Sequence, residues 1–227
     1  MCINHVPENI KLVIFDVDGT LYDQSKLRNK MIVALVGYYL LRPWKYYELL
    51  IIYHFRKERE KKAGFTGENL YNEQFMWCAS KVNLPVEKVK AVIDKWIFQF
   101  PNKYLKNCMY PGVKEIFNVL KANQIALAIY SDYDSKEKMA SMGIEAQLLV
   151  SSTDSTINSM KPLPKALNYI AERFNINDKN NCIFIGDREE LDGECAKNAD
   201  IPFLLINKKK ARNNFYSKLS KEILNGN

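Results

Sequence analysis

Two aspartates, Asp16 and Asp18, follow a short apolar run within Leu-Val-Ile-Phe-Asp-Val-Asp-Gly-Thr-Leu, residues 12–21. The four apolar residues predict a buried strand, and in an extended chain the two carboxylates share one face. Carboxylates that converge on one point repel each other unless a cation lies between them or one of them holds a proton. Gly19 permits a sharp turn behind them. The alternative is an ordinary strand followed by an Asp-Gly turn.

Three later segments add polar groups at comparable positions. They place Ser131 and Asp132 after the apolar residues 125–131, Lys161 just before a predicted helix, and Asp187 and Asp192 after the apolar residues 182–186. Each signal is weak alone, because a serine at a strand end often caps a helix and a Lys-Pro pair often begins a solvated one. Together they supply carboxylates for a magnesium ion, and a hydroxyl and an ammonium for phosphoryl oxygens.

In this order, the four segments resemble the motifs of the haloacid dehalogenase-like (HAD) hydrolase superfamily, in its phosphatase branch. Its four motifs are matched in turn by Asp16-Val-Asp18-Gly19-Thr20, by Ser131, by Lys161, and by Gly186-Asp187 with Asp192. The resemblance covers residues 10–23 and 109–206. Asp132 is a departure, because many members carry asparagine there.

The resemblance implies a Mg²⁺-dependent phosphatase that acts on a phosphomonoester through an aspartyl-phosphate. Asp16 would be the nucleophile and Asp18 the general acid and base, with a pKa that the neighbouring carboxylate raises toward neutrality. The other implied roles are metal binding by Asp16, Asp187 and the Asp18 carbonyl, phosphate binding by Ser131, Asp132 and Lys161, and orientation of Lys161 or a metal-bound water by Asp192.

Other functions use related chemistry. A phosphomutase would use Asp16 and Asp18 and return the phosphoryl group to a rotated intermediate. A membrane-surface phosphatase of lipid or prenyl phosphates is a further alternative. A dehalogenase is disfavoured because it needs no magnesium and no second aspartate, and a phosphonatase because no motif marks a Schiff-base lysine. A binding module without catalysis is disfavoured because all four motifs are intact.

Strands and helices alternate toward both ends of the chain. Strands are expected at 11–16, 125–131, 146–151, 182–186 and 201–206, and helices at 112–123, 135–142, 163–174, 189–198 and 211–224. This alternation predicts an α/β core, a Rossmann-like parallel sheet with helices on both faces. We expect the core to comprise residues 1–23 and 109–227.

Residues 24–108 lack strand-like alternation and predict an inserted, all-helical cap subdomain, with helices at about 26–41, 44–62, 68–82 and 86–100. In the resembling family such an insertion closes over the active site and selects the substrate. The segment holds 16 basic and 7 acidic residues, a net charge of +9, against −2 for the remainder. A basic, aromatic-rich cap suits a small anionic phosphorylated substrate, although solvated lysines on long helices are the simpler explanation.

Residues 31–41 are almost uninterruptedly apolar. Eleven residues are too few to span a bilayer, which takes about 20. A buried cap helix is the leading interpretation, and an interfacial helix, with Arg56-Lys57 and Lys61-Lys62 against anionic headgroups, is the alternative.

Five cysteines without paired spacing predict reduced thiols and a cytoplasmic protein, and no signal peptide is expected before the first strand. The only histidines, His5 and His54, argue against a histidine metal site. The basic run at 208–212 comes without a nucleic-acid-binding motif, so no nucleic acid partner is expected. The sequence indicates no oligomeric state.

Overall fold

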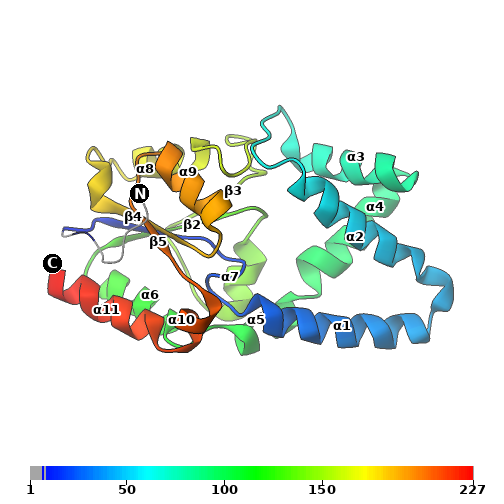
Figure 1. Cartoon of the computed structure of the whole chain (residues 1–227), viewed down its shortest axis with the longest axis horizontal. Coiled ribbons are helices and arrows are strands. Elements are labelled where there is room, and N and C mark those ends of the chain that lie inside the picture. The colour runs from blue at the N-terminus through cyan, green and yellow to red at the C-terminus, as the bar shows by residue number, and fades with distance from the viewer. Residues whose placement is uncertain (1–6, 8, 227) are drawn as a thin grey trace.

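The computed structural model describes residue 7 and residues 9–226. Five strands form one parallel sheet in the order β3-β2-β1-β4-β5. Their bounds are Leu12–Phe15 for β1, Ala126–Ser131 for β2, Leu148–Ser151 for β3, Cys182–Gly186 for β4 and Phe203–Leu205 for β5. The central strand β1 therefore lies between β2 and β4 (Figure 1). The three strands that precede the predicted site residues are neighbours, and their carboxyl ends meet at one edge.

Helices cover both faces of the sheet, as expected of strands that are apolar on both sides. Leu12 and Ile14 point to one face and Val13 and Phe15 to the other, and all four are fully buried. The first face packs on α8 (Lys165–Arg173) and α9 (Glu194–Asn198), and the second on α6 (Val113–Ala122), α7 (Lys136–Met142) and α11 (Phe215–Gly226). Figure 1 shows α8 and α9 above the sheet and α6 and α11 below it. The predicted Rossmann-like α/β fold is confirmed.

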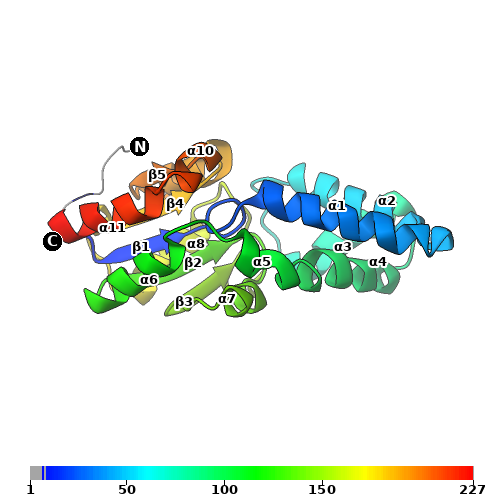
Figure 2. The same ribbon diagram turned by 90° about the horizontal axis from the view of Figure 1, so that it is seen from below.

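The segment between residues 24 and 108 is helical throughout, as predicted. It contains α1 (Gln24–Leu40), the 3₁₀ turn η1 (Pro43–Lys45), α2 (Tyr47–Glu60), α3 (Leu70–Val82), α4 (Val86–Ile93), the π-helical η2 (Asp94–Gln99) and α5 (Asn102–Cys108). These helices lie beside the sheet rather than over its faces (Figure 2). Aromatic rings fill the space between them, with Tyr38 4.9 Å from Trp96 and Phe55 5.7 Å from Phe75 between ring centroids.

The expectation that residues 31–41 form a buried helix is wrong. Helix α1 buries Leu27, Met31 and Tyr39 against its neighbours. Leu35 and Tyr38 are half-buried against the same neighbours. Ile32, Val33, Val36 and Leu40 face solvent, and Val33 and Leu40 are 74% and 76% exposed. The run is apolar on every side of the helix, so it contains no polar stripe from which the buried face could be inferred.

Asp23 joins the start of the helical segment to the end of the chain. Its carboxylate caps α1 by accepting hydrogen bonds from the backbone N–H groups of Ser25 and Lys26, at 3.0 and 3.1 Å. It also accepts hydrogen bonds from Arg212, at the end of α10 (Lys208–Arg212). Although burial opposes the charge, the Arg212 and backbone hydrogen bonds hold the pKa of Asp23 below its ordinary value.

Several boundaries differ from the expectation. The helix predicted at 211–224 is two helices, α10 and α11. The helix predicted at 189–198 begins with the π turn η4 (Glu189–Gly193). Helix α5 and the 3₁₀ turn η3 (Lys179–Asn181) were not predicted. The four cysteines in the described part of the chain are free and buried. Cys2 and His5 lie outside the described residues. No helix formed by residues 9–226 is long and apolar enough to cross a bilayer.

Candidate active site

Asp16 follows β1 and points into the crevice at the carboxyl edge of the sheet. It is 6% exposed. The Thr20 hydroxyl donates to its Oδ2 at 3.1 Å, and the Lys161 ammonium donates to its Oδ1 at 2.7 Å. Lys161, from the loop before α8, reaches across the edge of the sheet to this carboxylate. These two contacts fix the orientation of Asp16 from both sides.

The turn after Asp16 requires glycine at position 19. Gly19 has a φ of +98°, a conformation that L side chains rarely adopt. A β-carbon there would also lie 2.1 Å from Oδ2 of Asp187. The turn thus allows the aspartate that follows β4 to approach the one that follows β1.

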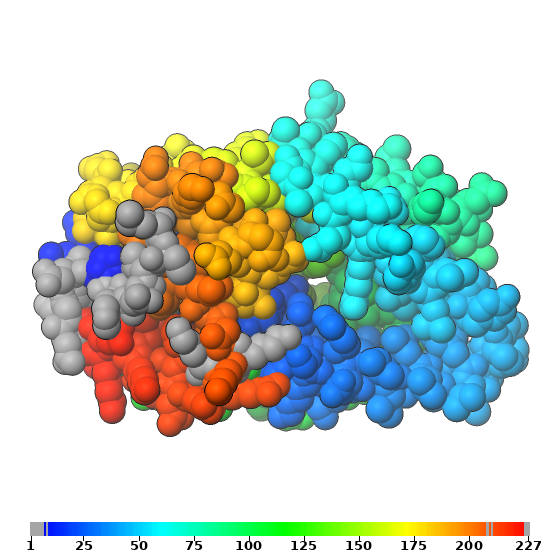
Figure 3. Space-filling model, in the orientation of Figure 1, coloured from blue at the N-terminus to red at the C-terminus, as the bar shows by residue number. Residues whose placement is uncertain are grey.

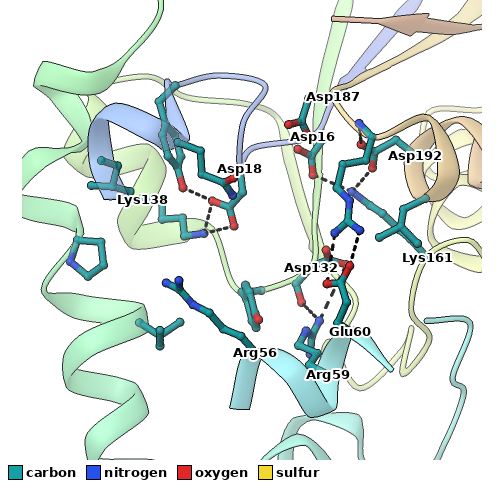
Figure 4. Close-up of a pocket in the computed structure, with 18 of the residues that line it drawn as sticks. Asp16, Asp18, Arg56, Arg59, Glu60, Asp132, Lys138, Lys161, Asp187 and Asp192 are labelled. Atoms are coloured by element: carbon teal, nitrogen blue, oxygen red, sulfur yellow. Dashed lines mark hydrogen bonds and ion pairs between the residues drawn. The ribbon is translucent and has the colours of Figure 1, made fainter. Parts of the chain in front are cut away.

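Three carboxylates converge at this point. Asp16, Asp187 and Asp192 each place an oxygen within 4.8 Å of the other two (Figure 4). Asp192 lies in the π turn η4, where its Oδ2 accepts a 3.1 Å hydrogen bond from the backbone N–H of Arg188. The π turn places Asp192 against the end of β4, so the cluster combines two neighbouring strands and the turn after them.

Lys161 compensates the charge of this cluster. Its ammonium is 2.7 Å from both Asp16 Oδ1 and Asp192 Oδ1, and the residue is 2% exposed. Burial favours the neutral amine, but the two carboxylates outweigh it and hold the pKa of Lys161 well above its ordinary value. Burial also raises the pKa of Asp16. Lys161 lowers this pKa and the other two carboxylates raise it, and the result lies well above the usual range.

The carboxylate cluster includes an oxygen atom that is free to bind a cation. Among the described residues, Asp187 Oδ1 is one of the few buried polar atoms without a hydrogen-bond partner. Burial and the neighbouring Asp192 raise the pKa of Asp187 to about 6. The donors are all oxygen atoms, which hard divalent cations such as Mg²⁺ prefer. These residues therefore fit a divalent cation between Asp16 and Asp187.

Asp18 lies across the pocket from this cluster and has partners of its own. The ammonium of Lys138, on α7, is 2.6 and 2.7 Å from its two oxygens, and the Tyr22 hydroxyl donates to Oδ1. Burial opposes the charge, but Lys138 and the Tyr22 hydrogen bond outweigh it and lower the pKa of Asp18. The expectation of a raised pKa is therefore wrong for this arrangement, because a nearby cation dominates over the nearby carboxylate.

The two residues after β2 differ in their surroundings. Ser131 is 1% exposed, and its hydroxyl accepts a 3.4 Å hydrogen bond from the backbone N–H of Tyr133. Asp132 lines the pocket, but it is directed to the helical segment: its carbonyl accepts from Arg59 of α2, and its carboxylate is 4.0 Å from the same guanidinium. Phosphate binding by these two residues stays a prediction.

A cavity of about 310 Å³ lies between the carboxyl edge of the sheet and the inserted helices. Figure 3 shows a narrow opening between the blue and cyan surfaces on this side of the molecule. One wall holds the catalytic candidates, and another is apolar and comprises Leu27, Met31, Ile97, Pro101 and Leu105. A polar group and an apolar body can therefore occupy the cavity together.

Two arginines of the inserted helices line the cavity without a partner. Within residues 9–226, neither Arg28 of α1 nor Arg56 of α2 makes a hydrogen bond or an ion pair. Figure 4 shows Arg56 extending from α2 toward Asp18 and Lys138. By contrast, Arg59 is buried and paired with Gln74 and Asp132. The unpaired guanidiniums are available to an anionic ligand.

The helical segment is attached to the loop that carries Lys161. The backbone N–H of Gly64 donates to the carbonyl of Lys161 at 2.9 Å, and that of Met160 donates to the carbonyl of Phe65 at 2.8 Å. An ion pair between Glu60 of α2 and Arg188, which follows β4, adds a second contact between the helical segment and the core. The segment therefore lies close to the site and contributes to its wall.

The structure brings Asp16, Asp18, Asp132, Lys161, Asp187 and Asp192 to one cavity, and Ser131 adjoins it from below the surface. Sequence reasoning missed Lys138, Tyr22, Arg28 and Arg59. The charge excess of residues 24–108 pointed to cations near the pocket, but no motif identified which arginines would face it. Lys138 lies within a helix and carried no signal.

Comparison with known proteins agrees with the motifs. A family model of haloacid dehalogenase-like hydrolases matches residues 13–206. No curated protein matches the chain in sequence. Solved structures with this fold include a β-phosphoglucomutase from Clostridium difficile, with a TM-score of 0.59 and 15% identity over 95% of this chain and 99% of that one. A HAD phosphatase from Thermococcus onnurineus has a TM-score of 0.57 and 18% identity. A 2-haloacid dehalogenase from Pseudomonas syringae has a TM-score of 0.60 and 16% identity. Each of these two alignments covers 88% of this chain and 87% of the other.

The Asp18–Lys138 pair allows a direct test by pH titration. Lys138→Met removes the ammonium and keeps the side-chain volume, so the pKa of Asp18 should rise above its wild-type value. Its carboxyl ¹³C shift, assigned with Asp18→Asn, reports this pKa. Because the folded-state pKa is lower than the value of about 3.9 in an unfolded chain, the pair stabilises the fold above that pH, and the stabilisation is lost as pH falls through the folded pKa.

Lys136→Met is the matched control, since Lys136 is exposed on the same helix. It should leave the titration of Asp18 unchanged. An equal pKa for Asp18 in wild type and Lys138→Met would show that the ion pair does not set its ionisation.

Proposed function

The chain belongs to the haloacid dehalogenase-like hydrolases, and from that premise we propose that it is a magnesium-dependent phosphatase acting through an aspartyl-phosphate. The observation that carries the proposal is the position of Asp16, which Thr20 and Lys161 orient beside two further carboxylates. Solved structures of this fold include a mutase, a phosphatase and a dehalogenase, so the fold alone does not select the reaction. The acidic cluster and the second aspartate favour phosphoryl transfer, because a halide needs no proton when it leaves.

Asp16 is the proposed nucleophile. One of its oxygens attacks phosphorus, the bond to the leaving oxygen breaks, and that oxygen takes a proton from Asp18. Water then attacks the phosphorus, Asp18 accepts its proton, and the Asp16 carboxylate is released. Two steps with positioned groups replace one direct attack by water.

A bound magnesium ion would neutralise charge on the phosphoryl oxygens and on Asp16. Asp16, Asp187 and the Asp18 carbonyl would hold it, and Asp192 would orient Lys161 through their 2.7 Å ion pair. Lys161 and Ser131 would bind the equatorial oxygens, where charge lies in the transition state. Asp132, whose carboxylate would repel an anion, would act through Arg59.

The Asp18–Lys138 ion pair would make proton donation by Asp18 depend on whether substrate is bound. With Lys138 bound, Asp18 is ionised and cannot donate a proton. A phosphate anion in the pocket would compete for the Lys138 ammonium and disfavour the Asp18 carboxylate, which would raise the pKa of Asp18. Asp18 would then hold a proton while a leaving group is present to receive it.

Residues 24–108 would act as the cap that selects the substrate, with residues 1–23 and 109–227 forming the core. The unpaired Arg28 and Arg56 and the apolar wall favour a small anionic phosphorylated compound with an apolar or planar part. The cavity of about 310 Å³ suits a small molecule rather than a polymer.

Replacing the acid should affect substrates unequally. Asp18→Asn should lower kcat/KM for an alkyl phosphate by about 10²-fold or more, the scale of general acid catalysis. The loss in the rate of the first step should be about tenfold smaller for nitrophenyl phosphate, whose leaving group needs little protonation. Burst-phase kinetics on both substrates provide the measurement, with the exposed Asp134→Asn as control. Equal losses for both leaving groups would contradict the role of Asp18.

Metal binding should appear in stability as well as activity. In chelator, Asp187→Asn should be at least as stable as wild type, because it relieves repulsion within the cluster. Magnesium at about 100 times its dissociation constant should raise the melting temperature of wild type by about 5 °C or more. It should leave that of Asp187→Asn nearly unchanged. Thermal scans of both proteins with and without MgCl₂ decide this, and equal shifts would exclude Asp187 as a ligand.

A further inference from the structure

Large apolar side chains that face solvent gather in one part of the molecule. Thirteen such residues are exposed in the described part of the chain, and ten of them lie between residues 32 and 53. They are Ile32, Val33, Val36, Leu40, Leu41, Trp44, Tyr46, Leu49, Leu50 and Tyr53. Single exposed apolar residues are ordinary, but a cluster of this size marks a surface that contacts something apolar.

The cluster follows the helices that carry it. On α1 the exposed residues recur at helical spacing, as at positions 32, 36 and 40, and on α2 they recur at 49, 50 and 53. The opposite sides of both helices are buried, as Met31 and Phe55 show. Packing within the protein therefore already uses one side of each helix, and the second apolar side is not covered by any residue that the structure describes.

Four of the five most exposed of these residues lie where the two helices meet. We define the tip as residues 40–46, which run from the last residue of α1 through η1 to the residue before α2. In it, Leu40, Leu41, Trp44 and Tyr46 are 76%, 75%, 68% and 66% exposed. Figure 1 shows this connection at the end of the molecule farthest from the sheet, so nothing in the core obstructs its approach to a flat surface.

The charge around the tip has one sign. Residues 24–57 hold seven basic residues and a single acidic one, Glu48. Glu48 is buried, where it accepts hydrogen bonds from Tyr39 and Trp96. Within the tip, Arg42 lies 4.8 Å from the Tyr38 ring, and Lys45 is 4.0 Å from Glu48, with its side chain 40% exposed. The solvent-facing charges of residues 24–57 are therefore cationic.

We propose that the tip binds the surface of a lipid bilayer that contains anionic headgroups. Leucine side chains enter the acyl boundary, tryptophan and tyrosine favour the headgroup level, and arginine and lysine attract anionic lipids. A second copy of the chain is a poorer occupant, because two tips in contact would bring together Arg42 and Lys45 of both copies, and residues 40–46 contain no acid. The inference does not depend on the proposed phosphatase activity.

Vesicle flotation of the whole chain tests the proposal. The protein is mixed with vesicles of phosphatidylcholine alone or of equal parts phosphatidylcholine and phosphatidylglycerol. Wild type should float with the mixed vesicles and less with the neutral ones, and salt should weaken its binding. The triple variant Leu40→Ser, Leu41→Ser, Trp44→Ser should reduce the partition coefficient by about tenfold or more. The matched control is Met76→Ser with Leu224→Ser, two exposed positions elsewhere, which should bind as wild type does.

The pair Arg42→Gln with Lys45→Gln tests the charge separately and keeps every apolar side chain. It should lower binding to the mixed vesicles by about tenfold and remove most of the salt dependence. Wild type that stays unbound at low salt would overturn the proposal, as would a triple variant that folds by circular dichroism and binds like wild type. Analytical ultracentrifugation distinguishes the rival: a dimer that the triple variant converts to monomer, without vesicle binding, would assign the tip to self-association.

Discussion

The site depends on three carboxylates held together at one edge of a sheet. Asp16, Asp187 and Asp192 have oxygens within 4.8 Å of each other, where their charges repel. Lys161 bridges two of them at 2.7 Å and is buried with them. Removing one partner of a buried ion pair leaves an uncompensated charge, which destabilises the fold more than forming the pair stabilises it. Lys161 therefore constrains the positions of the groups around it. The loop that carries it is in turn bonded to the inserted helices.

The same logic accounts for the contrast between the two aspartates of the first motif. Burial and two neighbouring carboxylates raise the pKa of Asp16, whereas a single ammonium outweighs burial at Asp18 and lowers its pKa. A cation and a phosphate anion entering the pocket would act on these two states in opposite directions. The cation would favour the Asp16 carboxylate, and the anion would disfavour that of Asp18. These different surroundings support the different roles that we propose for two side chains only two residues apart.

Residues that follow strands could be found from the sequence, and residues that depend on helix docking could not. Apolar runs ending in aspartate or serine located Asp16, Ser131 and Asp187, because parallel strands bring their carboxyl ends to one edge. Lys138 reaches the site only because α7 packs where it does, which no local pattern encodes. The burial of α1 was predicted wrongly because hydrophobicity shows that a side chain avoids water, and not which surface covers it. That missing cover is what points to a bilayer at the tip.

The proposed mechanism depends on a covalent bond between phosphorus and Asp16. It is tested most directly by quenching the enzyme during turnover, reducing it with borohydride and sequencing its peptides by mass spectrometry. An acyl phosphate at Asp16 is reduced to homoserine, whereas a free carboxylate does not react. We expect homoserine at position 16, in amounts that increase in Asp18→Asn, where water activation is lost. Rapid turnover without any modification at Asp16, or with the modification at another aspartate, would contradict it.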